Sequence, residues 1–145
     1  DYTKWAEGYR ISVKGNRVSW YKSKAKDYSY KTFRAYLDVV FAYAGTLSLA
    51  KELTSVPMTS MQIGDVLIQG GSPGHAVIVV DMAENPATGE KLYLLAQSYM
   101  PAQDIQVLVN PKERDKSPWY TLKRMGNILT PEWRFTSADL KRFKN

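Results

Sequence analysis

Apolar and polar residues follow two different periods along this chain, and the change between them divides it into a helical first part and a sheet-forming second part. Two short runs near the start, residues 9–13 and 17–20, flank the tripeptide Lys14-Gly15-Asn16. Gly and Asn tolerate the positive φ angles of a tight turn, so this arrangement predicts a β-hairpin.

The period becomes helical over residues 30–44, where one face is apolar and the other carries charged residues. Ser29 can cap the start of this helix, and Gly45 can end it. Thr46 can then cap a shorter helix that continues to Leu53 and stops before a proline. We expect the apolar face of the longer helix to lie in the core; it consists of Tyr30, Phe33, Leu37, Val40, Phe41 and Ala44.

The pattern of the second half is typical of a sheet. Residues 76–80 form a continuous apolar run between polar neighbours, which predicts a central strand buried on both faces. A loop around Pro86 leads to a returning strand at residues 91–97, and these two strands should pair antiparallel. Further strands are predicted at residues 65–69, 105–109 and 132–135, and a short helix at 138–143.

The composition is that of an ordinary globular domain: 145 residues, 44% hydrophobic and 23% charged. We therefore expect one α+β domain in which a helical N-terminal part packs on an antiparallel sheet. The chain has no Cys, which excludes a disulfide scaffold, a thiolate metal site and a thiol nucleophile within it. No apolar run approaches the ~20 residues of a membrane-spanning helix. The first residues contain no initiator methionine and no apolar signal core, so we expect a chain whose targeting segment has been removed.

The net charge of +6 favours anionic partners, but it describes only the surface potential. The basic residues are scattered, and no zinc finger, RNA-recognition signature or basic zipper accompanies them, so we expect no nucleic-acid partner. The four Trp residues fall in loops or at strand edges. They could line a groove for a sugar or peptide, although most aromatic residues belong to a core.

His75 is the only histidine, and it joins a Gly-rich turn to the buried strand. The predicted hairpin brings Gln97, or Tyr99 in the other register, opposite His75. A side-chain amide in that place can fix the tautomer and ring angle of an imidazole that acts as a base. The alternative is a histidine that merely hydrogen-bonds its own turn.

Other chemistries fit less well. Ser72 or Ser98, which we expect to lie near His75 in the fold, could act as a serine nucleophile, but neither begins a helix, where such a nucleophile is normally activated. The Gly-rich turn is followed by a strand, whereas a phosphate-binding loop needs a helix. A single histidine and scattered carboxylates match no zinc or calcium pattern, so we expect no metal and no cofactor. A glycosidase pair among the 14 carboxylates stays open, because a sequence does not show their separation.

The segment from Gly64 to Val80 resembles the histidine half of the papain-like NlpC/P60 and CHAP cell-wall amidases. The resemblance implies that His75 is the base, that Gln97 is its orienting partner and that Asp65 is the aspartate at the strand start. We expect the substrate site to contain Asp65, Ser72, Ser98 and Tyr99 beside His75 and Gln97.

Longer segments, at residues 27–49, 61–82, 94–105 and 130–135, resemble an uncharacterised bacterial family, domain of unknown function 4846. That resemblance implies an exported protein longer than this chain, with an upstream Arg-Cys pair that leads into a helix. The chain would then be the C-terminal part of a larger, extracytoplasmic domain.

Two functions follow as hypotheses. In the first, the chain is the histidine half of a cysteine amidase or peptidase that acts on cell-wall peptide, and an upstream segment supplies the nucleophile. In the second, it is a binding module for an anionic glycan or peptide that performs no chemistry. In either case we expect an open, partly apolar notch beside His75, lined by the turn at residues 70–74 and by Tyr99.

Overall fold

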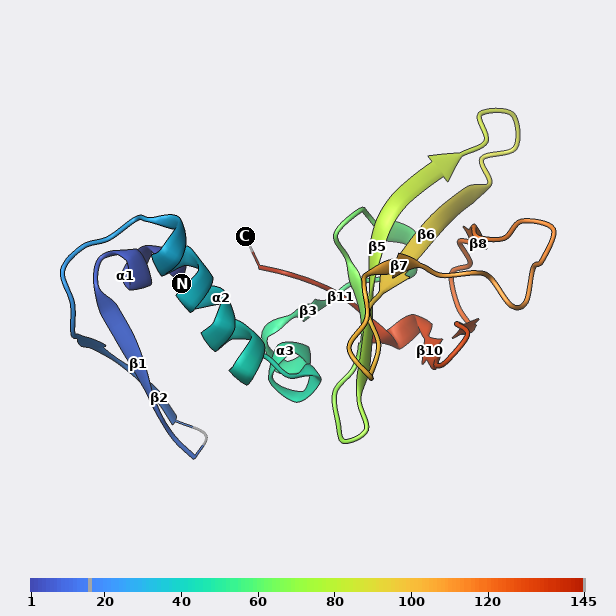
Figure 1. The fold of residues 1–145 in the computed structure, drawn as a ribbon. Helices are drawn as coiled ribbons and strands as arrows, with labels where there is room; N and C mark the ends of the chain where they lie inside the picture. Colours follow the sequence, from blue (N-terminus) through green and yellow to red (C-terminus); the bar gives the residue numbers. More distant parts are fainter. Residues whose placement is uncertain (16, 145) are drawn as a thin grey trace. The chain divides into compact units, whose positions relative to one another are not determined.

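A computed structural model describes residues 1–15 and 17–144 of the chain, which divides into two compact units, Asp1–Ala44 and Gly45–Asn145 (Figure 1). Both helices and antiparallel sheets are present, as the α+β prediction required. In the first unit the elements are α1 (Tyr2–Ala6), β1 (Tyr9–Lys14), β2 (Arg17–Lys22) and α2 (Tyr30–Tyr43).

The predicted hairpin is confirmed, because β1 and β2 pair antiparallel with Val13 opposite Val18. Gly15 has a φ of 57°, in the left-handed region that glycine adopts without strain. Asn16, the other turn residue of the prediction, lies outside the described residues.

Helix α2 begins where the sequence predicts. The Ser29 side chain accepts a hydrogen bond from the Thr32 backbone N–H at 3.3 Å. The backbone N–H of Ser29 in turn donates to the Asp27 carboxylate at 2.8 Å, which holds the capping residue in place.

The predicted burial of the apolar face of α2 is wrong. Phe33 is 37% exposed and Phe41 is 71% exposed. Of the residues of α2, all of which the structure describes, only Thr32 is buried, and the Trp5 indole N–H donates to its carbonyl at 3.1 Å. The helical period identifies an apolar stripe correctly, but it does not provide the surface that would cover the stripe.

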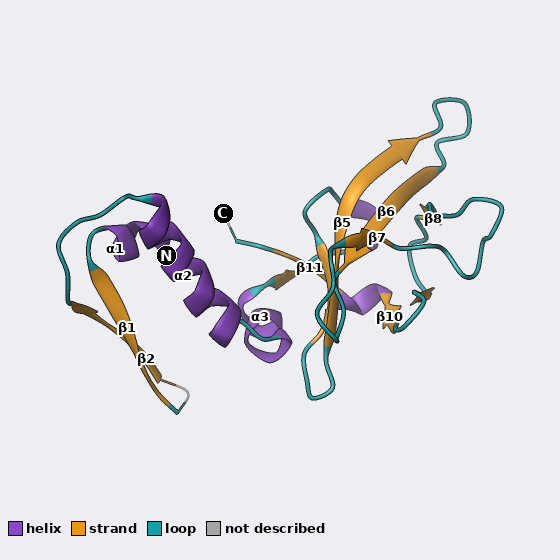
Figure 2. Ribbon diagram, in the orientation of Figure 1, coloured by secondary structure: helices purple, strands orange, loops and turns teal. Residues whose placement is uncertain are grey.

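In the second unit, α3 (Thr46–Glu52) precedes the sheet (Figure 2). The N-cap of α3 is Gly45 and makes no side-chain hydrogen bond, so Thr46 is the first helical residue rather than the predicted cap. The described residues form a seven-stranded antiparallel sheet of order β3-β11-β4-β5-β6-β7, with β8 also pairing with β6, and a separate pair β9-β10. The strands are β3 (Thr54–Ser55), β4 (Val66–Gln69), β5 (His75–Glu84), β6 (Lys91–Gln97), β7 (Gln106–Val107), β8 (Tyr120–Thr121), β9 (Asn127–Leu129), β10 (Arg134–Thr136) and β11 (Leu140–Arg142), and the 3₁₀ turns are η1 (Met58–Ser60) and η2 (Ser137–Asp139).

Strand β5 is central, but it is not buried on both faces as the sequence suggests. Val77 and Val79 are buried, whereas Ile78 and Val80 are each 39% exposed. The alternation is that of an antiparallel sheet with one covered face. A continuous apolar run therefore does not by itself require that both faces be covered.

The predicted C-terminal helix at residues 138–143 is also wrong. Strand β11 occupies residues 140–142, pairing with β4 on one side and β3 on the other. Leu140 is fully buried while Phe143 is 53% exposed. The helical spacing of apolar residues in this segment is overridden by tertiary structure, because only an extended segment can form backbone hydrogen bonds with β3 and β4 at the same time.

The main core cluster lies on the covered face of this sheet. Its fully buried side chains come from strands β4, β5, β6, β10 and β11 and include Leu67, Val79, Tyr93, Leu95, Phe135 and Leu140. This rigid core fixes the ends of β5 and β6, where the candidate site lies.

Candidate functional site

His75 is the first residue of β5, and Gln97 is the last residue of β6. The two strands pair with Ile78 opposite Ala96, and continuing this register places Tyr99 level with His75. Gln97 therefore lies diagonally across from His75, at a distance that a long amide side chain can span.

The predicted hydrogen bond between His75 and Gln97 is confirmed. The His75 Nε2 atom lies 2.6 Å from the Gln97 Oε1 atom. The Gln97 amide nitrogen donates to the Glu132 carboxylate at 2.8 Å. Since a carboxylate only accepts, the amide must turn its NH₂ group toward Glu132 and its oxygen toward the imidazole. The neutral ring consequently carries its proton on Nε2, and Nδ1 keeps a free lone pair.

Aromatic rings surround this imidazole. The Tyr99 ring meets it edge-on at a centroid distance of 5.2 Å, and the Trp133 ring lies 5.4 Å away. Phe135 stacks at 6.1 Å from the interior side. These contacts leave His75 only 8% exposed, so the ring has one defined position.

The position of Trp133 is itself fixed by hydrogen bonds. Its indole N–H donates to the Gln69 side-chain oxygen at 2.9 Å, and the Gln69 amide nitrogen donates to the Asp139 carboxylate at 2.9 Å. Gln69 is the residue of β4 that pairs with His75. Gln69 of β4 and Asp139 of η2 thus fix the position of the Trp133 ring beside His75.

His75 opens onto a hollow of about 440 Å³, as expected for the notch. Gly74 lies at its edge, where a Cβ atom would clash with Thr46 Oγ1 and with the Gly71 backbone. Tyr99 lines this hollow as predicted, and of the predicted turn at residues 70–74, Pro73 and Gly74 do so. The lining residues are Pro73, Gly74, His75, Ser98, Tyr99, Met100, Ala102, Gln103 and Trp133.

The structure brings four of the six predicted site residues together, namely His75, Gln97, Ser98 and Tyr99. Ser72 is exposed on the preceding turn and does not line the hollow.

Asp65 lies at the far end of β4, next to Val66, whereas His75 pairs with the residue at the other end. Its fully buried carboxylate accepts hydrogen bonds from Arg142 at 2.7 and 2.9 Å and from the Gln62 backbone at 2.9 Å. This carboxylate raises the pKa of the Arg142 guanidinium through their hydrogen bonds, so the guanidinium stays charged.

Sequence reasoning missed Glu132 and Gln69 as parts of the site. Both act through partners far along the chain, Gln97 and Trp133, and no local period connects such positions. The one sequence feature that could have pointed to Glu132 is its position directly before Trp133, in the predicted strand at residues 132–135.

Within residues 1–15 and 17–144, no three His, Cys, Asp or Glu side chains are grouped so that they could hold a metal ion. In the same part of the chain, no helix is both long and apolar enough to cross a bilayer.

The fold and this site define an α+β protein with a buried histidine, held in one tautomer by a side-chain amide, at the base of an aromatic hollow. Residues 1–142 match the family described as domain of unknown function 4846, and the chain belongs to that family. Comparison with curated proteins and with solved structures finds no match.

Proposed function

We propose that this chain is the histidine half of a cysteine amidase or peptidase that acts on cell-wall peptide outside the cytoplasm. The observation that carries the proposal is the series of hydrogen bonds from His75 to Gln97 to Glu132, at 2.6 and 2.8 Å. It leaves Nδ1 of a buried imidazole as the atom that can take a proton. In the papain-like NlpC/P60 and CHAP domains, too, a polar residue on the following strand accompanies the histidine base.

In the proposed reaction, His75 Nδ1 accepts the proton of a cysteine thiol, and the thiolate attacks the carbonyl carbon of the substrate amide. The imidazolium returns that proton to the leaving amine as the C–N bond breaks, which gives a thioester. Water then hydrolyses the thioester, with His75 again as the base. Because the chain has no Cys, the nucleophile must come from another segment of the natural protein.

The hollow beside His75 supports a peptide substrate. Tyr99 and Trp133 offer aromatic surface, and the exposed Ser98 hydroxyl offers a polar group at the same place. The net charge of +6 favours a substrate with free carboxylates, as cell-wall peptides have.

The first test is labelling of the full natural protein with a thiol-directed probe at neutral pH. We expect one reactive cysteine, and we expect His75→Ala to slow its labelling by about tenfold or more, because the imidazolium no longer lowers the thiol pKa. Gln97→Leu should slow labelling by a smaller factor, since it releases the ring without removing it.

Gln62→Leu, at an exposed position, is the matched control and should label at the rate of the unmodified protein. A natural protein without a cysteine, or labelling that is unchanged in His75→Ala, would overturn the amidase proposal.

The second candidate is a module that binds an anionic glycan or peptide without chemistry. It is favoured by the aromatic wall of Tyr99 and Trp133 on a hollow of about 440 Å³. On this proposal, cell-wall fragments should bind the isolated chain, and Trp133→Ala should abolish that binding while His75→Gln preserves it.

A further inference from the structure

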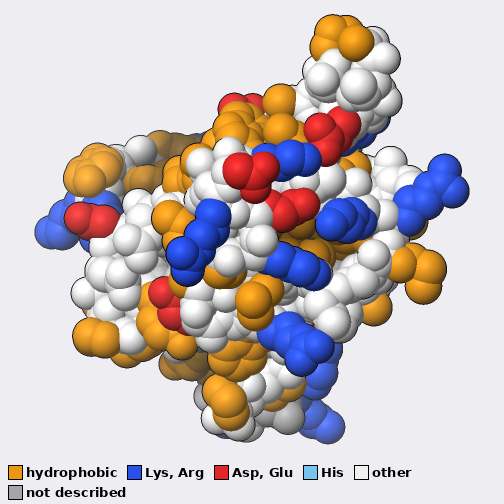
Figure 3. All heavy atoms as spheres, turned by 90° about the vertical axis from the view of Figure 1, so that its right-hand side faces the viewer, with side chains coloured by type: hydrophobic (Ala, Val, Ile, Leu, Met, Phe, Trp, Pro, Cys, Tyr) orange, Lys and Arg blue, Asp and Glu red, His pale blue; other side chains and the backbone are white. Residues whose placement is uncertain are grey.

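A second hollow, separate from the one beside His75, lies between β8, β9 and the loop that follows Val109. Its volume is about 140 Å³, and it shares no lining residue with the His75 hollow. A neighbouring depression of about 440 Å³ shares Lys112, Asn127 and Leu129 with it and adds Arg134. Because they share lining residues, the two hollows adjoin each other, and together they are called the recess. Figure 3 shows Lys and Arg side chains, with some Asp and Glu among them, on the side of the molecule that lies at the right in Figure 1.

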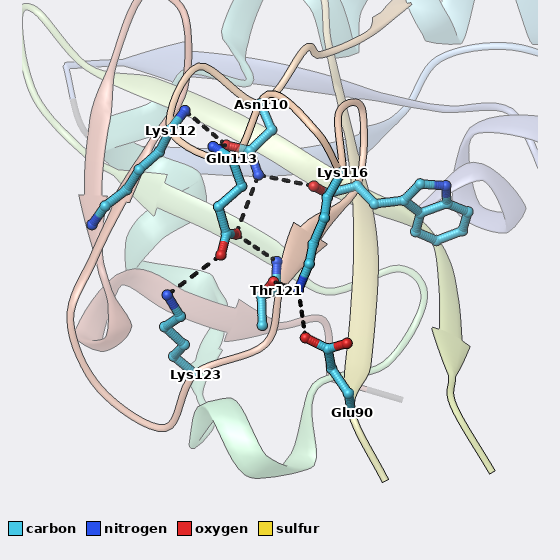
Figure 4. Close-up of polar contacts among 8 residues, drawn as sticks. Glu90, Asn110, Lys112, Glu113, Lys116, Thr121 and Lys123 are labelled. Atoms are coloured by element: carbon cyan, nitrogen blue, oxygen red, sulfur yellow. Dashed lines mark hydrogen bonds and ion pairs between the residues drawn. The ribbon is translucent and has the colours of Figure 1, made fainter. Parts of the chain in front are cut away.

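The wall of this recess is a loop with a fixed shape. The Asn110 side-chain oxygen accepts hydrogen bonds from the backbone N–H groups of Lys112 and Glu113, at 3.0 and 3.1 Å. Its amide nitrogen donates to the Trp119 carbonyl at 2.8 Å. Figure 4 shows these contacts at the centre of the network. Asn110 is 2% exposed, so the loop keeps its geometry without a ligand.

The charge around the recess is predominantly positive. Lys112, Lys123 and Arg134 line it, against the single carboxylate of Glu113. Glu113 lies 3.6 Å from Lys123 and accepts a hydrogen bond from the Thr121 backbone, so it is already engaged within the wall. Lys112 and Arg134 form no ion pair with any described residue. In Figure 4 the Lys112 side chain extends away from the network, with no contact drawn to its ammonium group.

At the inner end of the recess lies Tyr93, whose side chain is 99% buried but whose hydroxyl hydrogen-bonds no described residue. By contrast, the hydroxyl of the neighbouring Tyr120, on which Tyr93 stacks at 5.6 Å, donates to the Val109 carbonyl at 2.7 Å. Burial raises the pKa of Tyr93 far above the physiological range, so its hydroxyl remains a neutral donor. Among the described residues no buried side-chain donor or acceptor lacks a partner, so this hydroxyl borders the open space of the recess, where it can donate to a bound group or to water.

The geometry points to a binding site for a small oxyanion, a phosphate or a carboxylate group, held by Lys112 and Lys123 and by the Tyr93 hydroxyl. A volume of about 140 Å³ admits such a group and a few further atoms, while Arg134 and Lys112 offer charge to the remainder of a longer anion in the adjoining depression. The site does not depend on the function proposed for His75.

The test is a titration of the chain, followed by amide NMR shifts, with sodium phosphate in one arm and sodium galacturonate in the other. Sodium chloride keeps the ionic strength constant, because general surface attraction is screened by salt. We expect saturable shifts around Lys112, Lys123 and Asn127 in at least one arm. The arm that saturates at lower concentration identifies phosphate or carboxylate as the natural group.

Three variants and one control separate a built site from general charge. Tyr93→Phe keeps the stacked ring and removes only the hydroxyl, so it should weaken binding by about 3- to 10-fold, the usual effect of one hydrogen bond. Lys112→Met and Lys123→Met should each weaken it at least as much. Lys51→Met makes the same change of charge on α3, at an exposed position outside the recess, and should leave the affinity unchanged.

The proposal is overturned if neither anion gives saturable shifts. It is also overturned if Tyr93→Phe binds as the unmodified chain does, or if Lys51→Met weakens binding as much as Lys112→Met. The first of these two results would remove the Tyr93 hydroxyl from the site, and the second would mean that the anions respond to net charge alone.

Discussion

Gln97 is 3% exposed, and each end of its amide has one charged or aromatic partner, Glu132 on one side and His75 on the other. Glu132 touches neither the hollow nor the imidazole, yet its carboxylate decides which way the amide faces. The tautomer of His75 is therefore determined by a residue that does not contact the ring, because the exposed Glu132 carboxylate acts on the imidazole through Gln97.

Replacing that carboxylate should release the tautomer. In Glu132→Gln the new amide can either donate or accept, so Gln97 can turn over and offer its NH₂ group to His75. We expect the ¹⁵N shifts of the imidazole to change from a single Nε2-protonated form to a mixture of both tautomers. Glu84→Gln, which loses a surface pair with Lys91 instead, is the control and should leave the ring signals unchanged. A His75 ring that keeps one tautomer in Glu132→Gln would contradict this account.

Asp65 has a structural consequence that can be measured separately. Its carboxylate is fully buried and accepts three hydrogen bonds, two of them from Arg142. Asp65→Asn should lower the free energy of unfolding by about 2–3 kcal/mol, because Arg142 then loses its charged partner while part of its side chain stays buried. Urea denaturation measures this change. Asp81→Asn, at an exposed position on β5, should change stability by less than about 0.5 kcal/mol.

At the scale of elements, the sequence predicts a strand accurately where turn-forming residues flank an apolar run. The strands at residues 66–69 and 91–97 end within a residue of their predicted limits, because a Gly-rich turn and a loop around Pro86 mark their ends. The hydrogen bond between His75 and Gln97 follows from the same hairpin. Local patterns could not reveal β11, whose extended form depends on strands 70 or more residues away in the chain. For the same reason they could not connect Glu132 with Gln97.

The loop from Asn110 to Glu113 should make the second unit sensitive to acid. Burial alone would raise the pKa of the Glu113 carboxyl, but hydrogen bonds from Thr121 and the charge of Lys123 together lower it below the usual 4.5. A carboxyl with a lowered pKa in the folded state adds stability above its unfolded pKa, and that stability is lost as the pH falls through the folded pKa. We expect the unfolding free energy to decline as the pH drops below about 4.5.

Glu113→Gln should remove part of this decline, since the amide does not titrate. Comparing denaturation curves at neutral and acidic pH for the variant and the unmodified chain measures the difference. Equal acid sensitivity in both would show that other carboxylates account for it. Glu52→Gln, at an exposed position on α3, is the matched control.

At the scale of the whole molecule, every residue of the two apolar core clusters belongs to the second unit. The buried apolar residues of the first unit are Trp5 and Ala6, and its longest helix exposes Phe41. The two units therefore differ sharply in how much apolar surface they remove from water, which is the main source of folding free energy.

This difference predicts that the segment Gly45–Asn145 folds by itself. It contains the seven-stranded sheet, both core clusters and the His75–Gln97–Glu132 hydrogen bonds, so it meets the requirements of an independent domain. The isolated segment should unfold cooperatively in urea and give the same His75 ring signals as the full chain. The segment Asp1–Ala44 is close to the limit of about 40 residues below which a single core rarely suffices, and it should show only weak, gradual unfolding alone. If Gly45–Asn145 proves unfolded in isolation, the first unit must contribute to its stability, and the site could not be assigned to the second unit alone.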